Sequence, residues 1–300
     1  MKKKPKVSII INCLNGEKYL KECLKSVLGQ SYKNFEIIFW DNGSTDNSKQ
    51  IVSQFKDKRI KYFFSKKKYH LSEARNKAVD AAKGEFIAFL DVDDWYLPNK
   101  LDLQINEFKK NKNIGIVCSQ YFLFNQDTKK RTIIKSRINK NNITQQLIDN
   151  YNIGILTVMI KKNVLKKIRF EKRFNIIEDF DFIIRCSILT KISYIHTPTA
   201  FYRSHNKNLS KTNIKDHINE LKVWKRKFKK FTKEEFNFHL FDIKLEFLRI
   251  KNDILLKKRK SALMKFFNFE KKLYNPKIFA YFFLILIPNF LAKRILKHRI

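Results

Sequence analysis

The sequence predicts an α/β fold, in which a mostly parallel sheet flanked by helices is followed by a helical, basic C-terminal region. Short apolar runs alternate with amphipathic segments of helical period up to about residue 122, as in parallel strand–helix–strand units. The runs are nearly continuous in apolar residues, which is typical of strands covered on both faces. Apolar residues make up 44% of the chain, enough for a large core.

The elements of the N-terminal part follow from these patterns. Strands are expected at residues 7–11, 35–40, 60–64, 86–90 and 114–122. Helices are expected at residues 19–28, 46–55, 73–82 and 98–110, because apolar residues recur there at helical spacing. Gly29 is expected to end the first helix, Ser72 to cap the third, and Gly84 to end it in a left-handed conformation.

The rest of the chain is less regular and then changes in character. A strand is expected at residues 155–160, a helix at 182–189 opened by Glu178, Asp179 and Asp181, and short strands at 192–195 and 200–202. An apolar stripe at 214–228 and a capping box at 232–235 indicate two long basic helices, the second reaching about residue 256. We therefore expect a catalytic domain at residues 1–212 and a helical region at 213–300.

The chain carries a large excess of positive charge, with 64 Lys and Arg against 28 Asp and Glu and a formal net charge of +36. Such a chain attracts polyanions, so a nucleic-acid-binding protein is an alternative class. However, the charge is spread along the whole sequence and no DNA- or RNA-binding motif is present. We therefore expect no nucleic-acid partner.

The four cysteines, Cys13, Cys23, Cys118 and Cys186, show neither a CxxC pair nor the spacing of metal ligands. They fall in strand-like and helix-like runs, which indicates buried free thiols in a reducing compartment. Residues 1–6 are basic like the start of a signal peptide, but the apolar run behind them is too short for one. A cytoplasmic protein is therefore expected.

Residues 278–287 form an uncharged run of ten residues within the basic segment 277–300. The run is too short to span a bilayer, which takes about 20 apolar residues. Its flanking lysines and arginines are typical of an interfacial anchor on an anionic membrane surface. The alternative is a helix packed on the protein's own core, and the flanking charge favours the anchor.

The acidic stretch Asp91-Val92-Asp93-Asp94 directly follows the apolar run 86–90, at a strand end where open α/β sheets bind ligands. Three carboxylates in four positions repel each other unless a cation or hydrogen-bond donors hold them. Mg²⁺ or Mn²⁺ suits such oxygen ligands and is bound through one or two carboxylates plus a substrate's phosphates. A solvated acidic turn before the next helix is the alternative.

Polar turns follow three of the expected strands, around Asn12, Asp41 and Asp91. Parallel packing would bring these turns together at one edge of the sheet. No GxGxxG follows the first strand, and no GxxxxGK[ST] sequence occurs in the chain. A dinucleotide-binding oxidoreductase and a P-loop phosphotransferase are therefore disfavoured.

Five short motifs are spread over about residues 6–210. They are VSIIINCLNGEKYL (7–20), DNGSTD (41–46), ARNKA (74–78), FLDVDDW (89–95) with Pro98 and Leu101, and Glu178-Asp179. In order and spacing they resemble family 2 glycosyltransferases of the GT-A fold, and five coincident motifs are far more specific than any one. The C-terminal helical region carries no motif of that family.

The resemblance implies an inverting transfer of a sugar from a nucleotide diphosphate sugar, most often a UDP-sugar, with Mg²⁺ or Mn²⁺. Matched to the motifs, Asp91 and Asp93 are the DxD pair. Asp93 would contact the metal directly, and Asp91 would lie near the ribose or bridge through water. Asp179 would be the general base for the acceptor hydroxyl, and plain helix capping is the alternative role of Glu178 and Asp179.

The resemblance also implies contacts with the nucleotide. Asp41 and Arg75 would hold its base, and Asn12 would line the same pocket. Two positions depart from the family pattern: Asn42 stands where many members have a second Asp, and Asn12 replaces a common Pro. Asn42 stays a nucleotide-binding candidate. His205 either faces the diphosphate, as a histidine does in some relatives, or is a loop residue without a role.

The expected function is thus hexosyl transfer to a glycan or lipid-linked acceptor in cell-surface polysaccharide synthesis, by a protein peripheral to the inner face of the cytoplasmic membrane. The alternative within this fold is a catalytically inactive or nucleotidyltransferase-like protein that binds sugar nucleotides. Nucleotidyltransferases usually carry a Gly-rich, basic loop after the first strand, and the sequence has none there. A processive synthase is disfavoured because the chain lacks a QxxRW motif. The sugar, the acceptor and the oligomeric state stay open.

Overall fold

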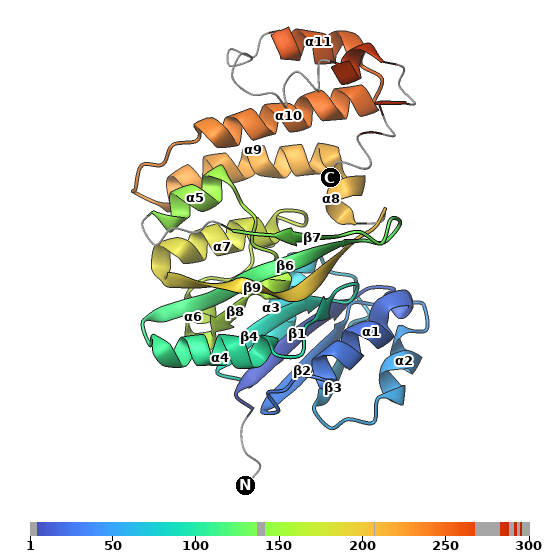
Figure 1. The fold of residues 1–300 in the computed structure, drawn as a ribbon, viewed down its shortest axis with the longest axis vertical. Helices are drawn as coiled ribbons and strands as arrows, with labels where there is room; N and C mark the ends of the chain where they lie inside the picture. The colour runs from blue at the N-terminus through green and yellow to red at the C-terminus, as the bar shows by residue number, and fades with distance from the viewer. Residues whose placement is uncertain are drawn as a thin grey trace. The chain divides into compact units, whose positions relative to one another are not determined.

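The computed structural model describes residues 5–136, 142–206, 208–267, 283–287, 291–292 and 295. It divides the chain into two compact units (Figure 1). The first comprises Met1–Leu147 and Tyr151–His205, and the second comprises Ile148–Asn150 and Asn206–Ile300. The division between His205 and Asn206 lies close to the expected boundary at residue 212.

The first unit is built on one nine-stranded sheet. Its strands are β1 (Val7–Cys13), β2 (Phe35–Asp41), β3 (Ile60–Phe64), β4 (Phe86–Asp91), β5 (Trp95–Tyr96), β6 (Ile114–Asn125), β7 (Arg131–Ile134), β8 (Met159–Lys161) and β9 (Lys191–Ser204). The order is β3-β2-β1-β4-β8-β6-β9-β5, and β7 pairs with β6. Strands β1 to β4, β6 and β9 run in one direction, whereas β5, β7 and β8 run against it. The predicted mostly parallel sheet is therefore confirmed.

Helices flank this sheet (Figure 1). The first unit contains α1 (Glu17–Leu28), α2 (Ser48–Gln54), α3 (Leu71–Ala81), α4 (Lys100–Lys110), α5 (Ile143–Asp149, which ends in the second unit), the 3₁₀ turn η1 (Ile155–Thr157), α6 (Lys162–Lys167) and α7 (Glu178–Leu189). Side chains alternate along each strand, so successive residues pack on opposite faces. Ile11 of β1 packs in one core with Leu24 of α1. On the other face, Phe89 of β4 lies 5.5 Å from Phe170, which stacks at 4.1 Å on Phe182 of α7.

Two expectations about the third helix are wrong. Ser72 lies inside α3, whose N-cap position is His70. Among the described residues, Gly43 is the glycine with a positive φ, so Gly84 does not end the helix in a left-handed conformation. Glycine is needed at residue 84 because the main chain there lies close to β1. A Cβ at this position would lie 2.5 Å from the backbone nitrogen of Ser8.

The strands expected after residue 150 also differ from the structure. Residues 155–160, expected as one strand, begin with η1 and continue into β8. The two short strands at 192–195 and 200–202 are parts of the single strand β9. Its pairing with β6 shifts register three times along its length. These shifts let one strand carry Arg203 and Ser204 to the edge where β6 ends at Asn125.

The second unit is helical, with α8 (Leu209–Thr212), α9 (Ile214–Phe231), α10 (His239–Leu255) and α11 (Arg259–Phe267). The expected apolar stripe of α9 is confirmed, and its Trp224 lies 5.2 Å from Phe241 of α10. The predicted capping box is wrong, since α10 begins at His239. Thr232 accepts a hydrogen bond from the Glu234 backbone at 3.0 Å in the turn before it.

The structure also bears on the cysteines and on membrane-spanning helices. The four cysteines are free and buried, as expected. Over the described ranges, none of the helices has the length and apolar character needed to cross a membrane.

Candidate active site

The expected convergence of strand ends is confirmed by the register of the sheet. Asn12 of β1 lies opposite Asp91 of β4, and Cys13 of β1 lies opposite Asp41 of β2. Because side chains alternate, Asn12 and Asp91 belong to one face of the sheet, and Asp41 belongs to the other. The amide nitrogen of Asn12 is buried and has no partner among the described residues. The edge therefore presents polar groups from both faces.

The turn after β2 is held by its own polar side chains. The buried Asp41 carboxylate accepts hydrogen bonds from the Ser44 backbone at 2.8 Å and the Tyr62 hydroxyl at 2.7 Å. The Asn42 amide donates to the Tyr69 carbonyl at 2.9 Å and accepts from the Tyr69 backbone N–H at 3.1 Å. An aspartate cannot donate in this way. The departure from the family pattern at Asn42 thus has a local cause.

Arg75 links three elements of the site. It lies on α3 with only 2% of its side chain exposed, and its Nη2 donates to both oxygens of Asp91, at 2.6 and 2.9 Å. Its Nη1 pairs with Glu178 at the start of α7. Burial disfavours the charged guanidinium, but the carboxylates of Asp91 and Glu178 raise the Arg75 pKa above its ordinary value. Arg75 thus ties the aspartate turn to the acidic start of α7.

The three aspartates of the turn have different surroundings. Asp94 is buried, accepts a hydrogen bond from the Arg203 backbone at 2.8 Å, and has a raised pKa because of burial and the nearby charges of Asp93 and Asp91. Asp91 and Asp93 keep 32% and 24% of their side chains exposed. His205 Nε2 lies 2.9 Å from Asp93 Oδ2. Asp94 is therefore internal, while Asp91 and Asp93 face outward.

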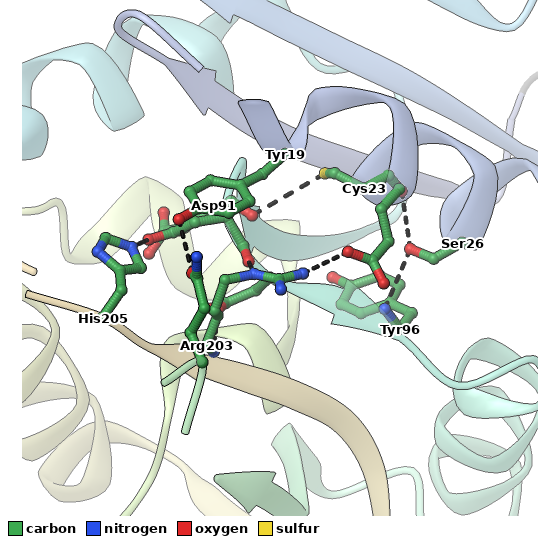
Figure 2. Close-up of polar contacts among 11 residues, drawn as sticks. Tyr19, Cys23, Ser26, Asp91, Tyr96, Arg203 and His205 are labelled. Carbon is green, nitrogen blue, oxygen red and sulfur yellow. Dashed lines mark hydrogen bonds and ion pairs between the residues drawn. The ribbon is translucent and has the colours of Figure 1, made fainter. Parts of the chain in front are cut away.

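Arg203 and His205 reach from the end of β9 toward this turn (Figure 2). Arg203 Nε donates to the Asp93 carbonyl at 2.7 Å, and its guanidinium carbon lies 4.4 Å from the Trp95 ring centroid. His205 stacks on Tyr19 with the ring centroids 5.4 Å apart. His205 therefore lies beside the aspartate turn. Tyr19, which lies on α1, falls within the first motif but was not among the expected site residues.

The candidate base, Asp179, is the second residue of α7. Its Oδ1 accepts a hydrogen bond from the Phe180 backbone at 2.7 Å. Burial raises the Asp179 pKa to about 6, although the Arg75 guanidinium opposes that rise. Burial also raises the pKa of neighbouring Glu178, again against the effect of Arg75. A carboxylate with a pKa near 6 is ionised at neutral pH and is a stronger base than an ordinary aspartate.

A divalent cation fits the donor set at the turn. Within the described ranges, no three His, Cys, Asp or Glu side chains are grouped as a metal site. Mg²⁺ bound mainly through a nucleotide's phosphates does not need such a group, because one or two protein carboxylates suffice. Asp91 and Asp93, with exposed oxygens on one turn, supply that number.

Comparison with known proteins agrees with this geometry. Residues 8–169 match the family described as Glycosyl transferase family 2. An uncharacterized glycosyltransferase of Haemophilus influenzae is 31% identical over 218 residues, which cover 71% of this chain and 85% of that protein. The Escherichia coli protein named UDP-Glc:alpha-D-GlcNAc-diphosphoundecaprenol beta-1,3-glucosyltransferase WfgD is 36% identical over 165 residues, covering 55% of this chain and 63% of that relative.

Solved structures share the fold. S. aureus TarS 1-349 in complex with UDP-GlcNAc superposes with a TM-score of 0.63 at 18% identity, covering 96% of this chain and 81% of that one. Mannosyltransferase PcManGT from Pyrobaculum calidifontis in complex with GDP-Man and Mn2+ gives a TM-score of 0.59 at 13% identity, covering 99% and 85%. The sheet and its edge site therefore define a GT-A type glycosyltransferase. The chain belongs to glycosyltransferase family 2.

Proposed function

We propose that the protein is an inverting glycosyltransferase that moves a hexosyl group from a nucleotide diphosphate sugar to a hydroxyl of a glycan or lipid-linked acceptor. The observation that carries this proposal is Arg75, which pairs with Asp91 and with Glu178 and so joins the aspartate turn and the start of α7 in one site. A UDP-sugar is the donor we favour. The E. coli relative is named for a UDP-Glc donor and a diphosphoundecaprenol acceptor, which supports a role in cell-surface polysaccharide synthesis.

Each end of the site has a separate task in this proposal. Asp93, with Asp91, would hold Mg²⁺ or Mn²⁺, which when bound supplies positive charge to the leaving diphosphate. His205, 2.9 Å from Asp93, would face the same diphosphate. In this proposal Asp91 would help to hold the metal while it is paired with Arg75. The ion pair with Arg75 fixes the orientation of the Asp91 carboxylate.

Asn12, Asp41, Asn42 and Arg75 would form the nucleoside end of the site. Asp41 and Arg75 are almost fully buried and paired within the protein. In our proposal they contact the nucleobase and also fix the shape of the pocket that holds it. The amide nitrogen of Asn12, buried and without a partner among the described residues, is the group best suited to a new hydrogen bond there.

Asp179 would remove the proton from the acceptor hydroxyl as that oxygen attacks the anomeric carbon. In a single displacement the nucleophile enters opposite the leaving group, which inverts the configuration and requires the base on the far side of the sugar. Asp179 lies on α7, whereas Asp93 follows β4. Arg75 pairs with Asp91, near Asp93, and with Glu178, next to Asp179, and so fixes the two ends of the site relative to each other.

Hydrolysis and transfer assays test the proposed function directly. The protein should slowly hydrolyse one nucleotide sugar of a panel in the presence of Mn²⁺, and should transfer that sugar faster when a lipid-linked saccharide is added. Chelation of the metal should stop both reactions. Binding of nucleotide sugars without any turnover would favour the inactive alternative, and release of pyrophosphate from a nucleoside triphosphate and a sugar phosphate would favour the nucleotidyltransferase.

We also propose that the helical unit contacts an anionic membrane surface. Most of the segment 277–300 lies outside the described residues, but residues 283–287, 291, 292 and 295 are described. Leu284 and Ile285 are buried against α10 and α11, whereas Phe283 and Leu286 are 62% and 55% exposed. Within residues 283–287, one side thus packs on the protein and the other supports contact of apolar groups with lipid. Exposed basic residues of α9 add positive charge: Lys215, Lys222, Arg226, Lys229 and Lys230.

Replacing both Phe283 and Leu286 with Ser should lower binding to anionic vesicles at least about tenfold, because each large apolar side chain contributes about 1.5–3 kcal/mol when buried. The melting temperature should hardly change, since both side chains are exposed. Leu284→Ser is the matched control, and it should lower the melting temperature instead. Vesicle co-sedimentation and a melting curve measure the two effects. Unchanged vesicle binding in the double variant would contradict the anchor.

A further inference from the structure

Tyr151 carries a buried polar group that the fold does not use. It lies in the segment between α5 and η1, and its hydroxyl has no hydrogen-bond partner among the described residues. A buried hydroxyl without a partner loses the hydrogen bonds that water would give it. Such groups are rare in folded proteins, and each one needs an explanation. Packing alone does not explain this one, because phenylalanine would fill the same space without the cost.

The surroundings of Tyr151 point to the candidate base. Its ring packs edge-on against Phe180, with centroids 5.2 Å apart and planes at 78°. Phe180 directly follows Asp179 on α7. Burial raises the pKa of the Tyr151 hydroxyl, and the negative charges of Asp179 and Glu178 raise it further. By its ring contact, Tyr151 therefore lies beside the start of α7, next to the candidate base.

The Asp179 carboxylate also has room for another donor. Its Oδ1 accepts from the Phe180 backbone, and Oδ2 has no hydrogen-bond partner among the described residues. Arg75, the nearest cation, already pairs with Asp91 and Glu178. A carboxylate held by one backbone N–H can still rotate about its terminal torsion, which is broad. A second donor would fix the plane of the carboxylate and so the direction of its basic lone pair.

We propose that Tyr151 is a positioning residue for the catalytic base, with its hydroxyl donating a hydrogen bond to Asp179 Oδ2 so that a remaining lone pair of the carboxylate points at the acceptor hydroxyl. This inference rests on the proposed function of Asp179. No bond of the substrate forms or breaks at Tyr151, which keeps its proton throughout. The residue acts through Asp179, whose carboxylate takes up the acceptor proton.

The sign of the pH effect follows from the proposed hydrogen bond. The charged and titratable groups that face Asp179 are Arg75 of α3, Asp91 of β4, Glu178 of α7 and the hydroxyl of Tyr151, together with Tyr121 of β6. A donor stabilises the ionised carboxylate, so a hydrogen bond from the Tyr151 hydroxyl would lower the Asp179 pKa. Removing it raises that pKa, so the ionised base appears only at higher pH.

Tyr151→Phe tests the proposal through its pH profile. The acidic limb of kcat should move upward by about one pH unit, as expected for the loss of one hydrogen bond to a charged group. At pH 6 kcat should fall about fivefold or more, with a smaller fall at pH 8 and an unchanged KM for the donor. Tyr194→Phe is the matched control, because the Tyr194 hydroxyl accepts from the Ser136 backbone and its pKa is not affected by Asp179. That variant should leave the limb in place.

A second readout does not depend on turnover. Carbon-13 NMR of labelled aspartate follows the Asp179 carboxyl, which is assigned by the signal lost in Asp179→Asn. Its titration should move to higher pH in Tyr151→Phe and stay unchanged in Tyr194→Phe. A lower kcat with neither the limb nor the carboxyl titration moved would overturn the proposal. If the wild type turned over no donor, the proposed function would fail, and the NMR titration would still decide whether Tyr151 contacts Asp179.

Discussion

Replacing Asp93 with Asn is expected to abolish sugar transfer and the metal-dependent part of nucleoside diphosphate binding, with the fold intact. A divalent ion contributes several kcal/mol to stabilising the developing charge on a leaving phosphate, and the amide is a far weaker ligand. The substitution relieves repulsion among three neighbouring carboxylates and removes one partly exposed contact with His205. Such a contact is worth about 0–1 kcal/mol, so the melting temperature should change little. Calorimetric titration of UDP, with and without Mn²⁺, measures the effect.

Asp94→Asn is the matched control for this experiment. Asp94 is buried and accepts a hydrogen bond from the Arg203 backbone, which the amide oxygen of asparagine can also accept. The variant should keep metal-dependent UDP binding within a few-fold of the wild type. If the wild type bound UDP equally well without metal, or if Asp94→Asn lost binding as fully as Asp93→Asn, the assignment of Asp93 as the metal ligand would be wrong.

Asp179→Asn should leave donor affinity nearly unchanged and lower kcat by about 10²–10⁴-fold, the usual contribution of a general base. The amide has almost the same shape and can still accept from the Phe180 backbone, so folding should survive. In the wild type, kcat should fall as the pH drops through about 6, because the pKa of Asp179 is raised to that value and only the ionised carboxylate accepts a proton. The variant should lack this acidic limb. Steady-state kinetics from pH 5 to pH 8 test both statements.

Asp181→Asn, the same substitution two residues later in α7, controls for effects on the helix. Asp181 is buried and paired with Arg185, so Asp181→Asn should lower stability and keep most of the wild-type kcat. A value of kcat above about a tenth of the wild type in Asp179→Asn would fall outside the range for a general base. The base would then be reassigned to Glu178, which pairs with Arg75.

The sequence was most informative where structure depends on local patterns. The five strands expected between residues 7 and 122 are all present, and β3 agrees at both ends. Buried parallel strands are recognised in the sequence by continuous apolar runs, and the helices between them by the helical spacing of their apolar residues. Because parallel strands end at one edge, the grouping of Asn12, Asp41 and Asp91 also followed from the element order.

The parts that sequence reasoning missed depend on contacts between distant residues. The length of β9 is set by its pairing with β6, including Pro198, which faces Gln120 where the register shifts. The pairing of Arg75 with Glu178, which lies 103 positions later in the chain, has no local signal in the sequence. No local pattern marks Tyr151, because its proposed role depends on the folded chain placing it beside α7.

The amide of Asn42 has a consequence for how the site can change over evolution. It both donates to and accepts from the backbone of Tyr69, so the identity of one side chain is tied to the course of the main chain 27 positions away. A carboxylate at this position would set an acceptor against the Tyr69 carbonyl. Asparagine and aspartate are therefore not interchangeable at residue 42 of this chain. An exchange of Asn42 for Asp would therefore require a different path of the main chain at residue 69, which limits the side chains that this turn can accept.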